Sequence, residues 1–197
     1  MTFIGLLKLQ SDLEIIIESE RNNGFTPRKR DTKDIILGLD DELQEWLKEV
    51  PEALNFKNWK EKEYSYDDEV KEFADILFFI LQLFNKFNMT PVNDLLELWR
   101  RQDAVLYQEV DYLKKEDKYK LIMELVFQLK KTLYAPINDR FKYLMEILRL
   151  YMLIAEYRGF SCELIVSTYL SNWRNNTGRI DGDWSLKGEN NGIKNLK

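Results

Sequence analysis

The sequence contains no histidine and a single cysteine, Cys162, among its 197 residues. One cysteine excludes an internal disulfide and any zinc site built from several cysteines. The absence of histidine removes the commonest general base and the commonest metal ligand of proteins. Any chemistry that this chain performs must therefore rest on carboxylates, amides, lysine and arginine.

Proline and long hydrophobic runs are also scarce. The four prolines lie near the ends of periodic segments, which favours helices over a turn-rich β fold. The longest apolar run, ILFFILQLF at 76–84, is too short to span a bilayer. The first four residues, MTFI, lack the charged start and the cleavage site of a signal peptide. We therefore expect a cytoplasmic, all-α protein without membrane association.

Basic charge is too sparse for broad nucleic-acid binding. The formal net charge is -5, whereas sequence-independent binding needs a basic face that displaces counterions. A local basic pocket remains compatible with this balance. Because 45% of the residues are hydrophobic, the chain can bury one substantial core, and its length requires no second folded domain.

Apolar residues recur at helical spacing along most of the chain. Gly24 and Pro27 separate the first two helices, and Asp31 or Thr32 is expected to cap the second. We predict a catalytic domain over 1–173 and a flexible Gly/Asn-rich tail over 174–197. The predicted helices cover about 3–20, 32–50, 67–87, a segment that begins at Thr90 and Pro91, 117–132, 138–158 and 162–173.

Two pairs of acids lie beside apolar helix faces. Glu42 and Glu45 flank the apolar stripe of the second helix, and Glu72 and Asp75 lie three residues apart on the third. Ionised carboxylates near a core are costly unless they are paired or bound to metal. Two such pairs can meet across a helix pair and hold a hard cation, and the missing histidine and cysteines favour Mg²⁺ or Mn²⁺ over zinc.

The alternative is that these acids pair with lysine or arginine on neighbouring helices. The nearby acids Asp40, Asp41, Asp67 and Asp68 are assigned to ordinary surface and helix-dipole roles. Spacing alone does not decide between a metal site and ion pairs, because a short acidic motif is weakly specific.

In combination these segments resemble the dimeric, all-α dUTPases, which are related to the MazG-type nucleotide pyrophosphatases. The resemblance rests on ELQEW at 42–46, FKNWK at 56–60 and EFAD at 72–75, in that order. It implies that Glu42, Glu45, Glu72 and Asp75 bind Mg²⁺ while water attacks the α-phosphorus of dUTP, which gives dUMP and pyrophosphate. In that mechanism Glu45 orients and deprotonates the water.

The resemblance extends to both ends of the chain. LQSDLE at 9–14 is similar to the first-helix segment whose glutamine reads the uracil edge, so Gln10 inherits that role. Gln10 suits an imide because its amide offers both a donor and an acceptor. Trp59, in the loop at 56–60, either stacks on the base or seals the loop.

The family's KxxxNxxRQ motif corresponds to NWRNNTGRI at 172–180. Asn176 and Arg179 match it, and the resemblance implies that they bind phosphate as the tail closes over the nucleotide. Asn172 stands where the motif has lysine, and Ile180 where it has glutamine. Arg174, or a lysine of residues 56–60, is the expected replacement for the missing charge.

Two rival functions remain at this point. One is a related pyrophosphatase that acts on dCTP or a modified deoxynucleotide. The other is a non-catalytic helical module that grips a protein partner with its acidic cleft and aromatic loop. A homodimer is expected in the enzymatic interpretation, from the family and from the long apolar segment at 138–158.

Overall fold

The computed structural model describes residues 1–19, 24–55, 63–90, 95–100 and 117–180. These residues contain helices and no strand, which confirms the all-α class. No helix among them is long and apolar enough to cross a membrane. The elements are α1 (Phe3–Ile17), α2 (Thr32–Glu49), the 3₁₀ helix η1 (Glu52–Leu54), α3 (Tyr66–Lys86), α4 (Leu95–Arg100), α6 (Lys118–Leu133), α7 (Arg140–Arg158) and α8 (Cys162–Ile180).

Local capping chemistry sets several helix ends where the sequence predicts them. The side chain of Asp31 accepts hydrogen bonds from the first turn of α2, and Asp34 reciprocates in a capping box. Gly159 ends α7 with φ of 76°, a left-handed conformation that glycine adopts without steric cost. Of the predicted helix start at Thr90 and Pro91, only Thr90 is described, because residues 91–94 lie outside the described residues.

The last helix is longer than predicted. We expected it to end near 173, but α8 continues to Ile180. Asparagine and glycine each cost only about 0.5–1 kcal/mol in a helix, and tertiary contacts offset this. Trp173 donates from Nε1 to the carbonyl of Leu9 at 2.9 Å, which ties this part of α8 to α1. Residues 174–180 are thus part of the helical body, whereas 181–197 lie outside the described residues.

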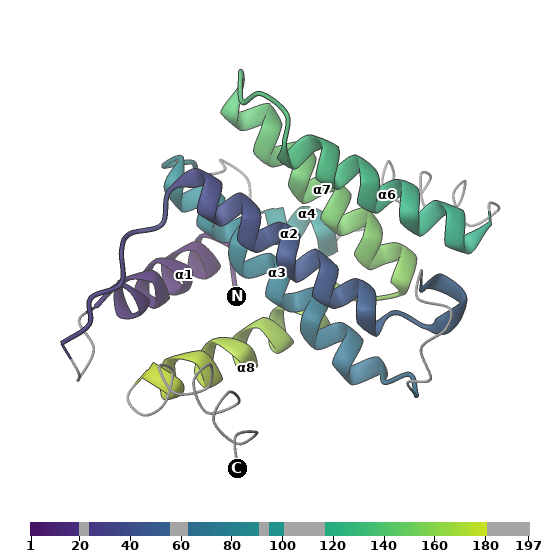
Figure 1. Cartoon of the computed structure of the whole chain (residues 1–197), viewed down its shortest axis with the longest axis horizontal. Coiled ribbons are helices and arrows are strands. Elements are labelled where there is room, and N and C mark those ends of the chain that lie inside the picture. The colour runs from purple at the N-terminus through teal and green to yellow at the C-terminus, as the bar shows by residue number, and fades with distance from the viewer. Residues whose placement is uncertain (20–23, 56–62, 91–94, 101–116, 181–197) are drawn as a thin grey trace, which may run out of the picture.

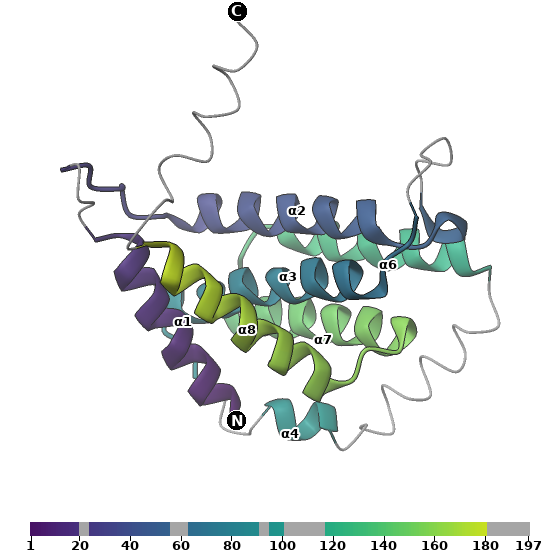
Figure 2. The ribbon, with the colours of Figure 1, turned by 90° about the horizontal axis from the view of Figure 1, so that it is seen from below.

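Helix α3 lies at the centre of the molecule (Figures 1 and 2). Its side chains are buried on almost all sides from Phe73 to Phe84, because helices pack around it. In both views α2 runs antiparallel along α3, whereas α1 and α8 cross beside it. Helix α6 packs on α7. An all-round apolar helix of this kind is the expected occupant of a helical core.

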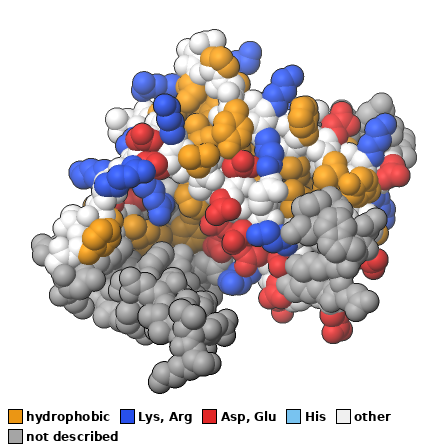
Figure 3. Space-filling model, viewed as in Figure 1, with side chains coloured by type: hydrophobic (Ala, Val, Ile, Leu, Met, Phe, Trp, Pro, Cys, Tyr) orange, Lys and Arg blue, Asp and Glu red, His pale blue; other side chains and the backbone are white. Residues whose placement is uncertain are grey.

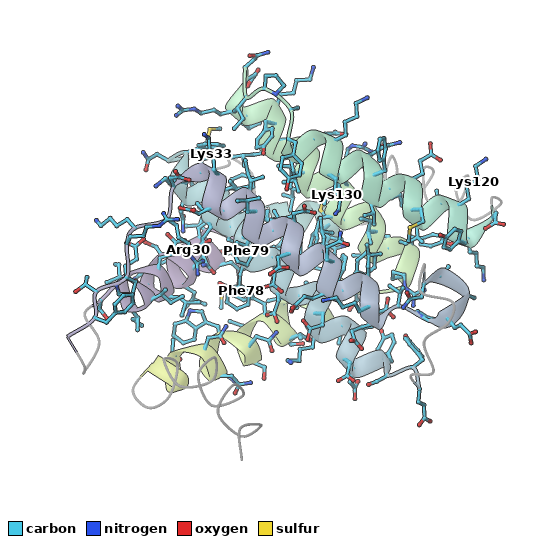
Figure 4. All side chains as sticks on the ribbon, viewed as in Figure 1. Arg30, Lys33, Phe78, Phe79, Lys120 and Lys130 are labelled. Carbon is cyan, nitrogen blue, oxygen red and sulfur yellow. The ribbon has the colours of Figure 1, made fainter. Side chains whose placement is uncertain are left out.

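The alignment of α2 against α3 is fixed by two contacts. Gly38 faces Phe79 so closely that a Cβ added at Gly38 would lie 2.2 Å from the ring. Two turns further along α2, the rings of Trp46 and Phe73 meet edge to face, with centroids 5.2 Å apart. Arg30 stacks over the same Phe79 ring at 5.6 Å (Figure 4). Between these contacts, the antiparallel alignment brings the acids of α2 opposite those of α3.

A buried ion pair anchors the beginning of α3 to the end of α7. Glu69 has no exposed surface, and Arg158 donates to its two carboxylate oxygens at 2.7 and 2.8 Å. The hydroxyl of Tyr64 donates to the same carboxylate at 2.8 Å. Every charge in this group therefore has a partner, as a buried ion pair requires.

Candidate functional site

Three carboxylates meet where α2 and α3 run side by side. Glu42, Glu45 and Glu72 each present one oxygen, and these oxygens lie within 4.8 Å of one another. Glu42 and Glu72 are half-buried, and Glu45 is exposed. Figure 3 shows acidic side chains gathered over this part of the molecule. The structure thus brings together three of the four acids that the sequence predicts as ligands.

The fourth acid, Asp75, lies beside this cluster and is held by a different partner. It does not belong to the group of three, although its charge acts on Glu42. Its Oδ1 accepts a hydrogen bond from Nδ2 of Asn172, on α8, at 2.8 Å. Asn172 therefore links the C-terminal helix directly to the acids of α3.

Proton affinities in the cluster are perturbed by burial and by like charge. Burial, followed by repulsion from Asp75, Glu45 and Glu72, raises the pKa of Glu42 to about 8. Burial is also the largest cause that raises the pKa of Asp75 to about 6; its hydrogen bond from Asn172 acts in the opposite direction. Crowded carboxylates in a partly desolvated site produce such shifts.

These carboxylates fit a divalent cation. Within the described part of the chain, no lysine or arginine forms an ion pair with Glu42 or Glu45, which counts against the ion-pair alternative for these two. Lys71 Nζ lies 3.5 Å from Glu72 Oε1, but both side chains are accessible to solvent. The donor set consists of oxygen alone, which suits hard ions.

Gln10 is buried rather than exposed on α1. Gln10 is only 2% exposed, and its Oε1 accepts a hydrogen bond from the hydroxyl of Tyr169 at 3.1 Å. Burial raises the pKa of the nearby Glu14 carboxyl, while the neighbouring amides of Gln10 and Asn85 act to lower it. Sequence reasoning singled out Gln10 but missed Tyr169, because this contact joins helices that are distant in the sequence.

The remaining predicted substrate contacts are placed only in part. Asn176 is half-buried on α8, one turn after Asn172. Arg179 lies in the last turn of α8, but its side chain is outside the described residues. Trp59 and the whole FKNWK segment also lie outside them. Arg174, one of the expected replacements for the missing lysine, is exposed on α8.

A cavity opens between the beginning of α3 and α8, next to Asn172. Its volume is about 380 Å³, enough for a small polar group such as a phosphate chain. Lys71 and Asp67 are its charged lining residues in the part of the chain that the structure describes. The complete lining is Tyr66, Asp67, Val70, Lys71, Leu164, Ser167, Thr168, Ser171, Asn172 and Asn175.

The relationship to known proteins agrees with this site. A family model described as dUTPase matches residues 2–184, which is nearly the whole chain. No individual curated protein matches it. The matched region spans the acids of α2 and α3, Gln10, and the C-terminal helix with Asn172 and Asn176. The chain therefore belongs to the all-α dUTPases, the enzymes that hydrolyse dUTP.

Proposed function

We propose that this dUTPase works at the cluster of Glu42, Glu45 and Glu72 and depends on Mg²⁺, which Mn²⁺ can replace. The observation that supports the proposal most strongly is the meeting of three carboxylate oxygens within 4.8 Å, with no ion pair to Glu42 or Glu45 among the described residues. Oxygen ligands of this kind are those of Mg²⁺ sites on triphosphates. The products of the proposed reaction are dUMP and pyrophosphate.

All four acids are metal ligands in this proposal, and Glu45 has a second part. Glu42 and Glu72, both half-buried, and the exposed Glu45 hold the cation, with Asp75 as a fourth ligand. When bound, Mg²⁺ supplies charge neutralisation at the phosphoryl oxygens and acidifies water. Glu45 is the member of the cluster most open to solvent, so it is the carboxylate best placed to orient a water and accept its proton.

The nucleotide is proposed to extend from this cluster toward α1 and α8. Gln10 reads the uracil edge, for which its Oε1 exchanges its present partner, the hydroxyl of Tyr169. Asn176 and Arg179 contact the phosphates, as the family motif implies, and Trp59 packs on the base. A site that satisfies the donor and the acceptors of the uracil imide rejects cytosine, which has another donor pattern. Thymine shares the imide, so its rejection depends on the 5-methyl group.

The proposal also includes a homodimer in the cytoplasm, and dUDP is a second candidate substrate. Helix α7, which the sequence suggested as a surface to be covered, is already buried within the chain over much of its length. Exposed apolar side chains lie elsewhere: Leu37 on α2, Phe127 on α6, and Tyr134 directly after α6. Tyr134 donates to Asp40 of α2, which places the end of α6 beside α2, and this side of the molecule is the proposed surface for a second copy.

The substrate and the metal requirement can be tested together. Pyrophosphate release should be measured from dUTP, dCTP and dTTP, each with Mg²⁺ and with a chelator. We expect turnover of dUTP that is lost with the chelator and is much slower on the other two nucleotides. Equal rates on all three would remove the uracil assignment, and metal-independent turnover would remove the proposed role of the acid cluster.

A further inference from the structure

Position 172 cannot supply the positive charge that the family motif places there, and its side chain is already occupied. Asn172 is only 7% exposed. Its Nδ2 donates to Asp75 Oδ1 at 2.8 Å and to the carbonyl of Lys71 at 3.4 Å. Because an amide nitrogen has two hydrogens, both are used inside the protein. A phosphate would gain nothing from Asn172 without breaking the contact that holds Asp75.

The carbonyl that Asn172 contacts belongs to Lys71, a basic residue beside the acids of α3. Lys71 lies four residues before Asp75, a spacing at which side chains on a helix are neighbours, and its ammonium also reaches the adjacent Glu72. Its Nζ is 3.5 Å from Glu72 Oε1, yet 53% of its side chain is exposed. Lys71 is also the basic group that lowers the pKa of Asp75. It lines the cavity of about 380 Å³ beside Asn172.

We propose that Lys71 binds the β- and γ-phosphates of the substrate, in place of the lysine that the family motif has at position 172. The inference rests on the proposed function, because it assumes that a triphosphate reaches the cluster of Glu42, Glu45 and Glu72. Lys71 then exchanges Glu72 for a phosphate oxygen. Its charge thus comes from α3, while Asn172 on α8 keeps Asp75 in position.

The chemistry of Lys71 suits this exchange. An exposed pair at 3.5 Å is weak, so releasing Glu72 costs little. A bond from an ammonium to phosphate is charge-assisted and stronger than a neutral hydrogen bond. The flexible four-carbon stem lets the ammonium follow a phosphate chain without a fixed fork geometry. The adjacent cavity gives the phosphates space within reach of Nζ.

Calorimetric binding of a non-hydrolysable α,β-imido analogue of dUTP, in the presence of Mg²⁺, tests the proposal. We expect Lys71→Met to weaken binding by about 10- to 100-fold, which is the loss of one charge-assisted phosphate contact. Lys71→Arg should retain most of the affinity. Binding of dUMP should stay within about twofold of the unmodified protein, because dUMP lacks the two outer phosphates.

Two controls separate a phosphate contact from a structural effect. Lys120→Met removes an exposed lysine at the beginning of α6, far from the acids (Figure 4), and should leave binding unchanged. Calorimetry with Mg²⁺ alone should show no weakening in Lys71→Met. Loss of Mg²⁺ binding in that variant, or undiminished binding of the analogue, would overturn the role of Lys71. Failure of the unmodified protein to bind the analogue would overturn the proposed function as well.

Discussion

Helix α3 presents acids to two environments that lie one turn apart. Glu69 is fully buried, but Arg158 and Tyr64 satisfy its carboxylate. Glu72 is more exposed, yet it meets two further carboxylates. Burial alone therefore does not mark a functional acid in this protein. The informative property is the crowding of three carboxylates beside a single weak ion pair, that of Lys71 with Glu72, among the described residues, because folding alone would not favour such crowding.

The largest expected effect comes from breaking the compensated group. Arg158→Met leaves Glu69 charged and buried without its partner, and we expect a loss of about 3–5 kcal/mol in the free energy of unfolding, measured by urea denaturation. Arg28→Met is the matched control, because Arg28 pairs with Asp34 at the surface, where solvent screens the pair, and its loss should change the stability far less. A loss at Arg158 as small as that at Arg28 would show that the buried ion pair stabilises the fold no more than a surface pair does.

The uncompensated group should respond in the opposite way. Glu42→Gln removes a carboxyl whose ionised form the folded cluster disfavours, so we expect the metal-free protein to gain on the order of 1–2 kcal/mol in stability at neutral pH. The same substitution should lower kcat/KM for dUTP by about 100-fold or more, because it removes a proposed metal ligand. Urea denaturation and pyrophosphate release measure the two effects. A variant that is both less stable and fully active would show that Glu42 serves the fold.

A smaller effect should appear when pH is varied. Folding raises the pKa of Glu42 from 4.5 to about 8 and that of Asp75 from 3.8 to about 6. The folded state thus holds protons that the unfolded state releases, and this contribution to stability is complete below about pH 4 and is lost as pH rises toward about 8. After allowance for solvent screening, we expect the metal-free protein to lose on the order of 1–2 kcal/mol across this range.

Mg²⁺ should stabilise the protein more at high pH than at low pH. A cation competes with protons for the same oxygens, so the rise in Tm on adding Mg²⁺ should be greater near pH 8 than near pH 5. Thermal unfolding with Mg²⁺ and with a chelator at both pH values measures the difference. An increment in Tm that is independent of pH would indicate that the ion binds away from Glu42 and Asp75.

Local sequence patterns were sufficient to predict the helices that form the acid cluster. The capping chemistry at Asp31 and Gly159 depends on neighbouring residues, and helical periodicity alone puts Glu42 and Glu45 at the edge of an apolar stripe. The meeting of these two with Glu72 follows once α2 and α3 pack antiparallel. For this reason three of the predicted ligands converge as expected.

Contacts between distant segments could not be predicted in the same way. Asn172 and Asp75 are 97 residues apart, and no local pattern signals that the first holds the second. Likewise, the contact of Trp173 with Leu9 helps to hold α8 against α1. A prediction from local helix propensity could not include this contact, and it placed the end of α8 too early. Nothing local indicates that Gln10 is buried and bonded to Tyr169, which is 159 residues away.

The close approach of Gly38 to Phe79 has a consequence for ionic radius. Gly38 lies one turn before Glu42, and the lack of a side chain there lets the axes of α2 and α3 come together. Small ions such as Mg²⁺ require oxygens at about 2.0–2.1 Å, whereas Ca²⁺ accepts about 2.3–2.6 Å. A methyl group at position 38 would collide with the Phe79 ring, so the ring or the helix would have to move. In the proposed metal site, we expect movement of the helix to bias the acids toward the larger ion. A residue that offers no ligand atom would thus influence which cation the proposed site prefers.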